Sequence, residues 1–348
     1  MEPERSAHGL RSSRTAQVLL ALLVVEVVAF TLSTVPGVRA TGGFDPLIDG
    51  WLQGAGYVTA AALAVLRPLT SSVDRAVWSW LAAALAVRAL GFVLFLAVVR
   101  WQDPLPYPSS ADAAWLAMYP LVFVGLVCAA RLRTRRLSTA LVLDGAVGAL
   151  AAAAVAVALL YEAVLSLTAP GMSASVVAVN LAYPVLDVAL LVVVVGLLMI
   201  LEWRAPLAGT ALTAGIVGFA VIDCVFAYQA ATGTFRPGTL LSGLSMVPMA
   251  VVAVAAWLPG RTRADRREPL PNVVLPGLFA LVCLGLLIVG TQEDVPGIGI
   301  GLAAAGVAVA LARTALSFRA VRAIAEHRRE ARTDELTGLA NRRAFNES

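Results

Sequence analysis

Long apolar runs, separated by short polar segments, follow one another along most of the sequence. A helix that crosses the hydrocarbon core of a bilayer needs about 20 apolar residues, and ten runs approach or exceed that length. The runs do not alternate between apolar and polar residues, as the strands of a transmembrane β-barrel would. The pattern therefore predicts an all-α fold, a polytopic transmembrane helix bundle of about ten spans. The predicted spans cover roughly residues 15–34, 50–67, 76–99, 113–130, 138–166, 175–202, 208–229, 239–258, 273–291 and 297–316.

The composition is that of a membrane protein. Of the 348 residues, 59% are hydrophobic and only 14% are charged, whereas an average soluble domain has about 25% charged residues. These values exclude a single soluble globular domain and a disordered chain. The three cysteines lie far apart in apolar runs and the chain has two histidines, so we expect no metal site.

The positions of the arginines predict the orientation of the bundle. All 26 basic residues are arginine, and the cytoplasmic loops of multi-pass proteins carry the excess of basic residues. With the N-terminus inside, 21 arginines fall in inside segments, and only Arg39, Arg100 and Arg236 fall in outside loops. If one span were miscounted, half of the loops would move to the other side of the membrane, and the arginines would no longer be concentrated on one side. We therefore expect an even number of spans and both termini in the cytoplasm.

Three prolines, Pro120, Pro184 and Pro248, are spaced 64 residues apart, each in a predicted span that runs from outside to inside. A proline inside a helix removes one backbone hydrogen bond and kinks the helix. Neighbouring helices can bind the freed carbonyl in a membrane bundle. The first two prolines each follow a tyrosine, Tyr119 and Tyr183. The spacing favours three tandem helix hairpins with a kinked second helix, and the alternative is a chance spacing of three prolines.

Several ionisable side chains fall inside the predicted spans. A charge at the bilayer centre costs about 2.5–3.5 kcal/mol on insertion scales, so such residues usually face the bundle interior. Arg88 lies near mid-span, and we expect it to pair with Asp187 or Glu26, which lie at a similar depth. The set is typical either of a sensing or ligand pocket or of a structural ion pair. Its members are Glu26, Arg88, Asp144, Asp187 and Asp223, with Glu162 near the outer end of its span.

The residues after the last predicted span form a separate region. Residues 317–332 are good helix formers without Gly or Pro, which predicts a juxtamembrane helix. That helix either pairs with the helix of a second copy in a homodimer or lies against anionic lipid headgroups. A turn at Gly338 and a helix N-cap at Asn341 are expected next. The chain thus divides into a transmembrane bundle over 1–316, the linker helix over 317–332, and a short terminal segment over 333–348.

The terminal segment contains the pattern Asp-x-Leu-Thr-Gly-Leu-x-Asn-Arg-Arg-x-Phe over residues 334–345. This pattern resembles the entry segment of GGDEF domains, which belong to the diguanylate cyclase family. A looser likeness to the multi-helix membrane regions of bacterial GGDEF proteins lies in the stretch from Pro106 to Asp112. In the family, the entry segment has a structural and linker-coupling role. The matching residues are Asp334, Leu336, Thr337, Gly338, Leu339, Asn341, Arg342, Arg343 and Phe345.

This resemblance implies a multi-pass protein of the bacterial inner membrane that continues into an α/β GGDEF domain. Two such domains, each holding one GTP and Mg or Mn, join two GTP into cyclic di-GMP, and the metal neutralises charge on the phosphates. The family's metal-binding and guanine-binding residues lie downstream of the entry segment, so none can be assigned within these 348 residues. We therefore expect this chain to be the sensor region of a diguanylate cyclase, without catalytic residues, GTP or metal of its own.

Two other classes of function stay open on the sequence. A membrane transporter or channel without enzymatic output would need a polar cavity across the bundle. A sensor kinase would need a phosphoacceptor histidine, and the residues around His327 do not resemble the histidine box of a kinase. The expected partners are the lipid bilayer and a second copy of the chain, and we expect no nucleic acid.

Overall fold

The computed structural model describes residues 13–39, 43–133, 139–166, 173–200, 207–231, 234–259 and 274–330. Over these ranges the protein is almost entirely helical and has no β-strand, which confirms the predicted all-α fold. The elements are α1 (Arg14–Ser33), η2 (Pro46–Leu52), α2 (Gln53–Thr70), α3 (Arg75–Ala97), η3 (Val99–Trp101), α4 (Ser110–Arg133), α5 (Thr139–Ser166), α6 (Ala174–Ile200), α7 (Leu207–Ala231), α8 (Leu240–Leu244), α9 (Met246–Ala255), α10 (Val274–Val289) and α11 (Gly297–Glu330).

Seven of the helices in the described ranges are long and apolar enough to cross a membrane, namely α1, α3, α4, α5, α6, α7 and α11. This indicates a membrane protein. The other three predicted spans are helical too, but each falls short of a full apolar span. Helix α2 carries Gln53 and Arg67 and is rich in alanine, α10 has only 16 residues, and the predicted span over 239–258 is divided at Ser245 into α8 and α9.

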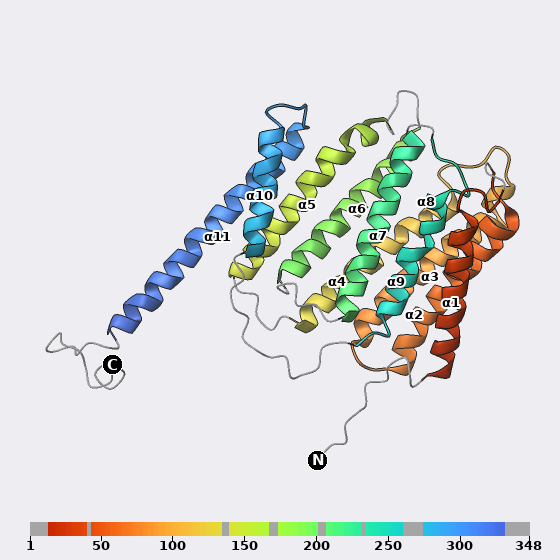
Figure 1. Ribbon diagram of the computed structural model, residues 1–348, viewed down its shortest axis with the longest axis horizontal. Helices are drawn as coiled ribbons and strands as arrows, with labels where there is room; N and C mark the ends of the chain where they lie inside the picture. The colour runs from red at the N-terminus through yellow and green to blue at the C-terminus, as the bar shows by residue number, and fades with distance from the viewer. Residues whose placement is uncertain are drawn as a thin grey trace, which may run out of the picture.

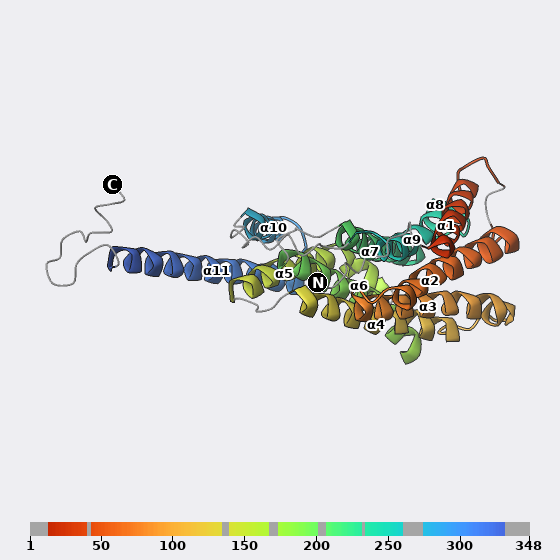
Figure 2. The same cartoon turned by 90° about the horizontal axis from the view of Figure 1, so that it is seen from below.

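The helices stand side by side in a broad bundle, with α1 at one edge and α10 and α11 at the other (Figure 1). Seen from below, α3 and α4 form one face, while α1, α8 and α10 lie on the opposite face (Figure 2). The most extensive packing joins α3 to α4, α5 to α6 and α11 to α5. Helix α7 packs on α9 in the same way.

These contacts make three consecutive helix hairpins, α3–α4, α5–α6 and α7–α8/α9, and each holds one of the spaced prolines in its second half. Helices α4 and α6 continue through Pro120 and Pro184, whereas Pro248 follows the division between α8 and α9. Pro248 has no N–H for the carbonyl four residues earlier. The Thr31 hydroxyl of α1 donates to the neighbouring carbonyl of Gly243 at 3.2 Å. The second helix is thus interrupted in the third hairpin, where α1 supplies a donor, and is continuous in the first two.

Glycines let the paired helices approach closely, as is common between membrane helices. A Cβ at Gly91 of α3 would overlap the Trp115 indole of α4, and one at Gly215 of α7 would overlap Val252 of α9. The large side chains packed between the helices, such as Leu81 and Met249, are fully buried.

Helix α11 is one uninterrupted helix of 34 residues. At 1.5 Å per residue it is roughly 50 Å long, well beyond the ~30 Å of a hydrocarbon core. It projects past the other helices at one end of the bundle (Figure 1). The predicted juxtamembrane helix is thus the direct continuation of the last span, as far as Glu330.

Candidate functional site

A cluster of polar side chains lies between α3, α4, α6 and α7, and Arg88 of α3 belongs to it. An Nη of Arg88 lies 4.0 Å from an Oδ of Asp223 on α7. The guanidinium carbon also lies 4.6 Å from the centre of the Phe219 ring. Phe219 and Asp223 are four residues apart, so they lie one above the other on the same face of α7. That face supplies Arg88 with an aromatic ring and a carboxylate together.

Asp187 of α6 is the second carboxylate of the cluster and is only 2% exposed. The Tyr119 hydroxyl of α4 donates to its Oδ1 at 2.8 Å. Both Asp187 and Asp223 act electrostatically on Arg88. The cluster therefore holds two carboxylates and one guanidinium, with Asp223 next to Arg88 and Asp187 bound to Tyr119.

A second tyrosine–aspartate pair joins the same two helices closer to their beginnings. Tyr183 of α6 donates to Asp112 of α4 at 3.1 Å, the reverse of the Tyr119–Asp187 pair. Each helix thus contributes one tyrosine and one aspartate. Along α4, Asp112 comes before Tyr119, and along α6 their partners Tyr183 and Asp187 follow in the same order. The two helices therefore run parallel. The two tyrosines are the ones that precede Pro120 and Pro184, so the repeated dipeptide has equivalent contacts in both hairpins.

Asp112 also caps the N-terminus of its own helix, α4. Its Oδ2 accepts from the Ser109 backbone N–H at 2.8 Å and from the Ser109 hydroxyl at 2.7 Å, as in a capping box. Nearby, Tyr107 donates to Asn180 Oδ1 at 2.5 Å. Burial, and then the Asp112 carboxylate, raise the pKa of the Tyr107 hydroxyl. Tyr107 therefore keeps its proton for this bond at neutral pH.

The predicted partners of Arg88 need one correction. Its ion-pair partner is Asp223, whereas Asp187 reaches the cluster through Tyr119 and Glu26 lies elsewhere. Glu26 of α1 accepts from Thr59 of α2 at 3.3 Å. Depth along the span does not predict the partner of Arg88, because it does not show which helices are neighbours. Helix α1, which carries Glu26, packs on α2, α8 and α9.

Asp144 is also part of an ion pair, and its partner is Arg313. Arg313 of α11 binds Asp144 of α5 with two bonds, from Nε at 2.6 Å and from Nη2 at 3.2 Å. Both residues are buried, and Arg313 reaches Ser317 as well. This pair ties α11 to the first turns of α5.

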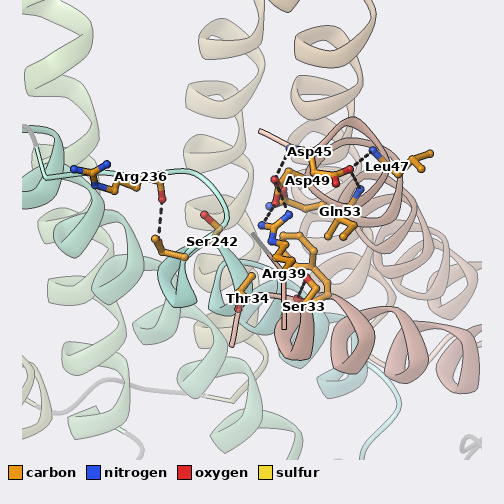
Figure 3. A network of polar contacts seen from close by, with 12 residues as sticks. Ser33, Thr34, Arg39, Asp45, Leu47, Asp49, Gln53, Arg236 and Ser242 are labelled. Carbon is orange, nitrogen blue, oxygen red and sulfur yellow. Dashed lines mark hydrogen bonds and ion pairs between the residues drawn. The ribbon is translucent and has the colours of Figure 1, made fainter. Parts of the chain in front are cut away.

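Sequence analysis missed a polar corner between the end of α1 and the start of α2 (Figure 3). Arg39 makes two bonds to Asp49 of η2, at 2.8 and 3.1 Å, and Asp49 also accepts from the Asp45 backbone. Gly238 lies against the Arg39 guanidinium, where a Cβ would overlap it, and its φ is +76°. Arg39 had been placed in an outside loop, but nothing in the sequence pointed to a partner ten residues later.

Some predicted residues lie outside the described ranges. They are the whole GGDEF-like segment, that is Asp334, Leu336, Thr337, Gly338, Leu339, Asn341, Arg342, Arg343 and Phe345, together with the side chains of Glu162 and His327.

The arrangement defines what the cluster of Arg88, Tyr119, Asp187 and Asp223 can do. The cluster has two carboxylates and one guanidinium. A bound cation or a proton can therefore balance the charge of the second carboxylate, and a ligand can donate a hydrogen bond to it. Among the described residues, no group of three or more His, Cys, Asp or Glu side chains is placed to hold a metal ion. Searches against models of protein families, curated proteins and solved structures find no match to this chain.

Proposed function

We propose that the chain is the multi-pass membrane sensor region of a bacterial diguanylate cyclase. The observation that carries the proposal is α11, a single helix that leads from a membrane span as far as Glu330. The residues that resemble the entry of a GGDEF domain begin four positions later, at Asp334. A rigid helix that leaves the membrane is the simplest means of passing a movement of the bundle to such a domain.

The bundle offers a contiguous route from the polar cluster to α11. The cluster uses α6 and α7, α6 packs on α5, and α5 holds α11 through Asp144 and Arg313. In the proposed mechanism, a ligand changes the pairing of Arg88 with Asp223, and the shift of α6 and α7 reaches α11 through α5. The signal then acts on the GGDEF domain through the linker helix.

The finer parts of the proposal are ten spans in the inner membrane and both termini in the cytoplasm. Helices in all ten predicted segments support the number of spans, and the arginine distribution supports the orientation. Topology reporters fused after Asp112 and after Arg263 should report the periplasm and the cytoplasm respectively. Both reporters on one side of the membrane would contradict this topology.

In the complete protein, two GGDEF domains would meet in a homodimer formed through the linker helix, each with GTP and Mg or Mn. The chain of 348 residues lacks the Gly-Gly-Asp-Glu-Phe loop, and we expect it to form no cyclic di-GMP from GTP with either metal. The test is to read the coding sequence past Ser348 and assay the continued protein. Synthesis by the continued protein and none by the 348-residue chain supports the proposal. A continuation without a GGDEF domain contradicts it and favours a transporter or another membrane protein.

A further inference from the structure

Glu26 is a buried carboxyl that the proposed signalling route does not use. It is 7% exposed, near the middle of α1, on the face that packs against α2 and α9. Its Oε1 accepts from the Thr59 hydroxyl at 3.3 Å. Its Oε2 is buried and has no hydrogen-bond partner in the described part of the chain. None of the ion pairs found among the described residues includes Glu26.

The surroundings of this carboxyl are close-packed. Gly56 of α2 lies directly beside it, and a Cβ there would overlap the methyl group of Met246 and lie 3.7 Å from the Glu26 Cβ. Met246 is fully buried at the start of α9. The Glu26 side chain is therefore packed closely between helices, and Thr59 is the one hydrogen-bond donor to its carboxyl among the described residues.

Other titratable groups on the packed elements are engaged elsewhere. On α2, Tyr57 bonds to Ser245, and Arg67 donates to the Ala256 carbonyl at 2.7 Å. Arg67 is eight residues from Thr59, roughly 12 Å further along the helix. Helices α8 and α9 have no titratable side chain.

On η2, Asp49 is paired with Arg39. On α1 itself, Arg14 is twelve residues from Glu26, roughly 18 Å along the helix axis. No cation on these elements thus neutralises Glu26.

An ionised carboxylate accepts up to about four hydrogen bonds and is very costly to bury without a charge partner. Glu26 has one weak donor and no partner charge, while a neutral carboxylic acid needs far less compensation. From this geometry we propose that Glu26 is an intramembrane proton-binding site. Its carbonyl oxygen accepts from Thr59, and the proton is held on the other oxygen. The inference does not depend on the proposed function, because it uses no residue of the polar cluster around Arg88 and none of α11.

The test is infrared spectroscopy of the full chain in phospholipid vesicles at neutral pH. Wild-type protein should show the C=O stretching band of a protonated carboxylic acid, and Glu26→Gln should lose it. Thr59→Val should keep the band and move it to higher frequency, because the carbonyl loses its donor. Incorporation of carbonyl-labelled glutamate should shift the band in wild-type protein, which identifies a glutamate without any substitution. Asp144→Asn is the matched control, and it should lose only carboxylate bands because Asp144 is paired with Arg313.

Two results would overturn the proposal. The first is a wild-type spectrum whose acid band is absent or insensitive to both Thr59→Val and the glutamate label. The second is a band that disappears when sodium chloride replaces choline chloride at constant pH, since the occupant would then be an alkali cation. A band that is unchanged by sodium supports proton binding.

Discussion

Two charged sites in the bundle are built on opposite principles. Between α5 and α11, Arg313 and Asp144 are matched one to one and joined by two short bonds, and both are buried. Between α3 and α7, Arg88 and Asp223 are 4.0 Å apart, and Asp187 of α6, which accepts from Tyr119, adds a second carboxylate to the cluster. The first arrangement has one stable geometry, because a bidentate pair fixes both distance and angle. The second can redistribute its contacts, because its single cation has a choice of acceptors.

This difference assigns different roles to the two sites. A matched pair on the helix that leaves the membrane keeps α11 in register with α5. In the proposed function, the unmatched cluster between four helices is where a ligand or ion changes the helix packing. Replacing each arginine in turn tests whether the two sites differ in this way.

The largest effect is expected for Arg313→Leu. It leaves Asp144 buried without a charge partner, which should lower the free energy of unfolding in detergent micelles by about 3–5 kcal/mol. The double variant Arg313→Leu with Asp144→Leu should recover most of that loss. Arg319→Leu, at an exposed position on the same helix, should change stability by less than about 0.5 kcal/mol. Equal losses for Arg313→Leu and Arg319→Leu would show that the pair does not fix α11.

A smaller loss of about 2–3 kcal/mol is expected for Arg88→Leu, because its contact with Asp223 is longer and less complete. A double-mutant cycle identifies the partner, since only residues in contact show a coupling energy. Asp223→Asn should recover part of the loss when combined with Arg88→Leu, whereas Glu26→Gln should add to it independently. Rescue by Glu26→Gln in place of Asp223→Asn would show that the helix neighbours are wrong.

The smallest effect is expected for Tyr119→Phe, which removes one hydrogen bond to Asp187 and keeps the ring. The expected cost is about 1 kcal/mol in the same unfolding measurement. Tyr183→Phe is the matched variant in the other tyrosine–aspartate pair and should cost a similar amount. A loss for only one of the two would show that the reciprocal pairs between α4 and α6 are not equivalent.

The helical segments could be predicted from the sequence, but the partners inside the bundle could not. The described part of each predicted span is largely helical, and seven of these helices are long and apolar enough to cross a membrane, where a helix satisfies its own backbone hydrogen bonds. The helices are apolar all round, so periodicity does not show which side faces a neighbour. This is why Arg88 was matched to acids by depth and its true partner Asp223 was ranked behind Asp187 and Glu26.

Contacts between residues distant in sequence were equally hidden. Arg313 and Asp144 are 169 residues apart, and nothing local marks them as a pair. The tyrosine–proline repeat was visible, and it did point to two residues of the site, Tyr119 and Tyr183. Their acceptors, Asp187 and Asp112, could not be predicted, because they depend on the parallel packing of α4 on α6.

The most direct test of the central claim is cyclic di-GMP synthesis by the protein continued through a complete GGDEF domain and reconstituted in lipid. Arg88→Leu should change its rate at equal protein amount by about fivefold or more, the lower end of usual coupling between distant sites. Val221→Ala, at an exposed position on α7, should leave the rate as in wild type. Equal rates in wild type, Arg88→Leu and Val221→Ala would contradict the claim that this cluster is the sensor of the enzyme.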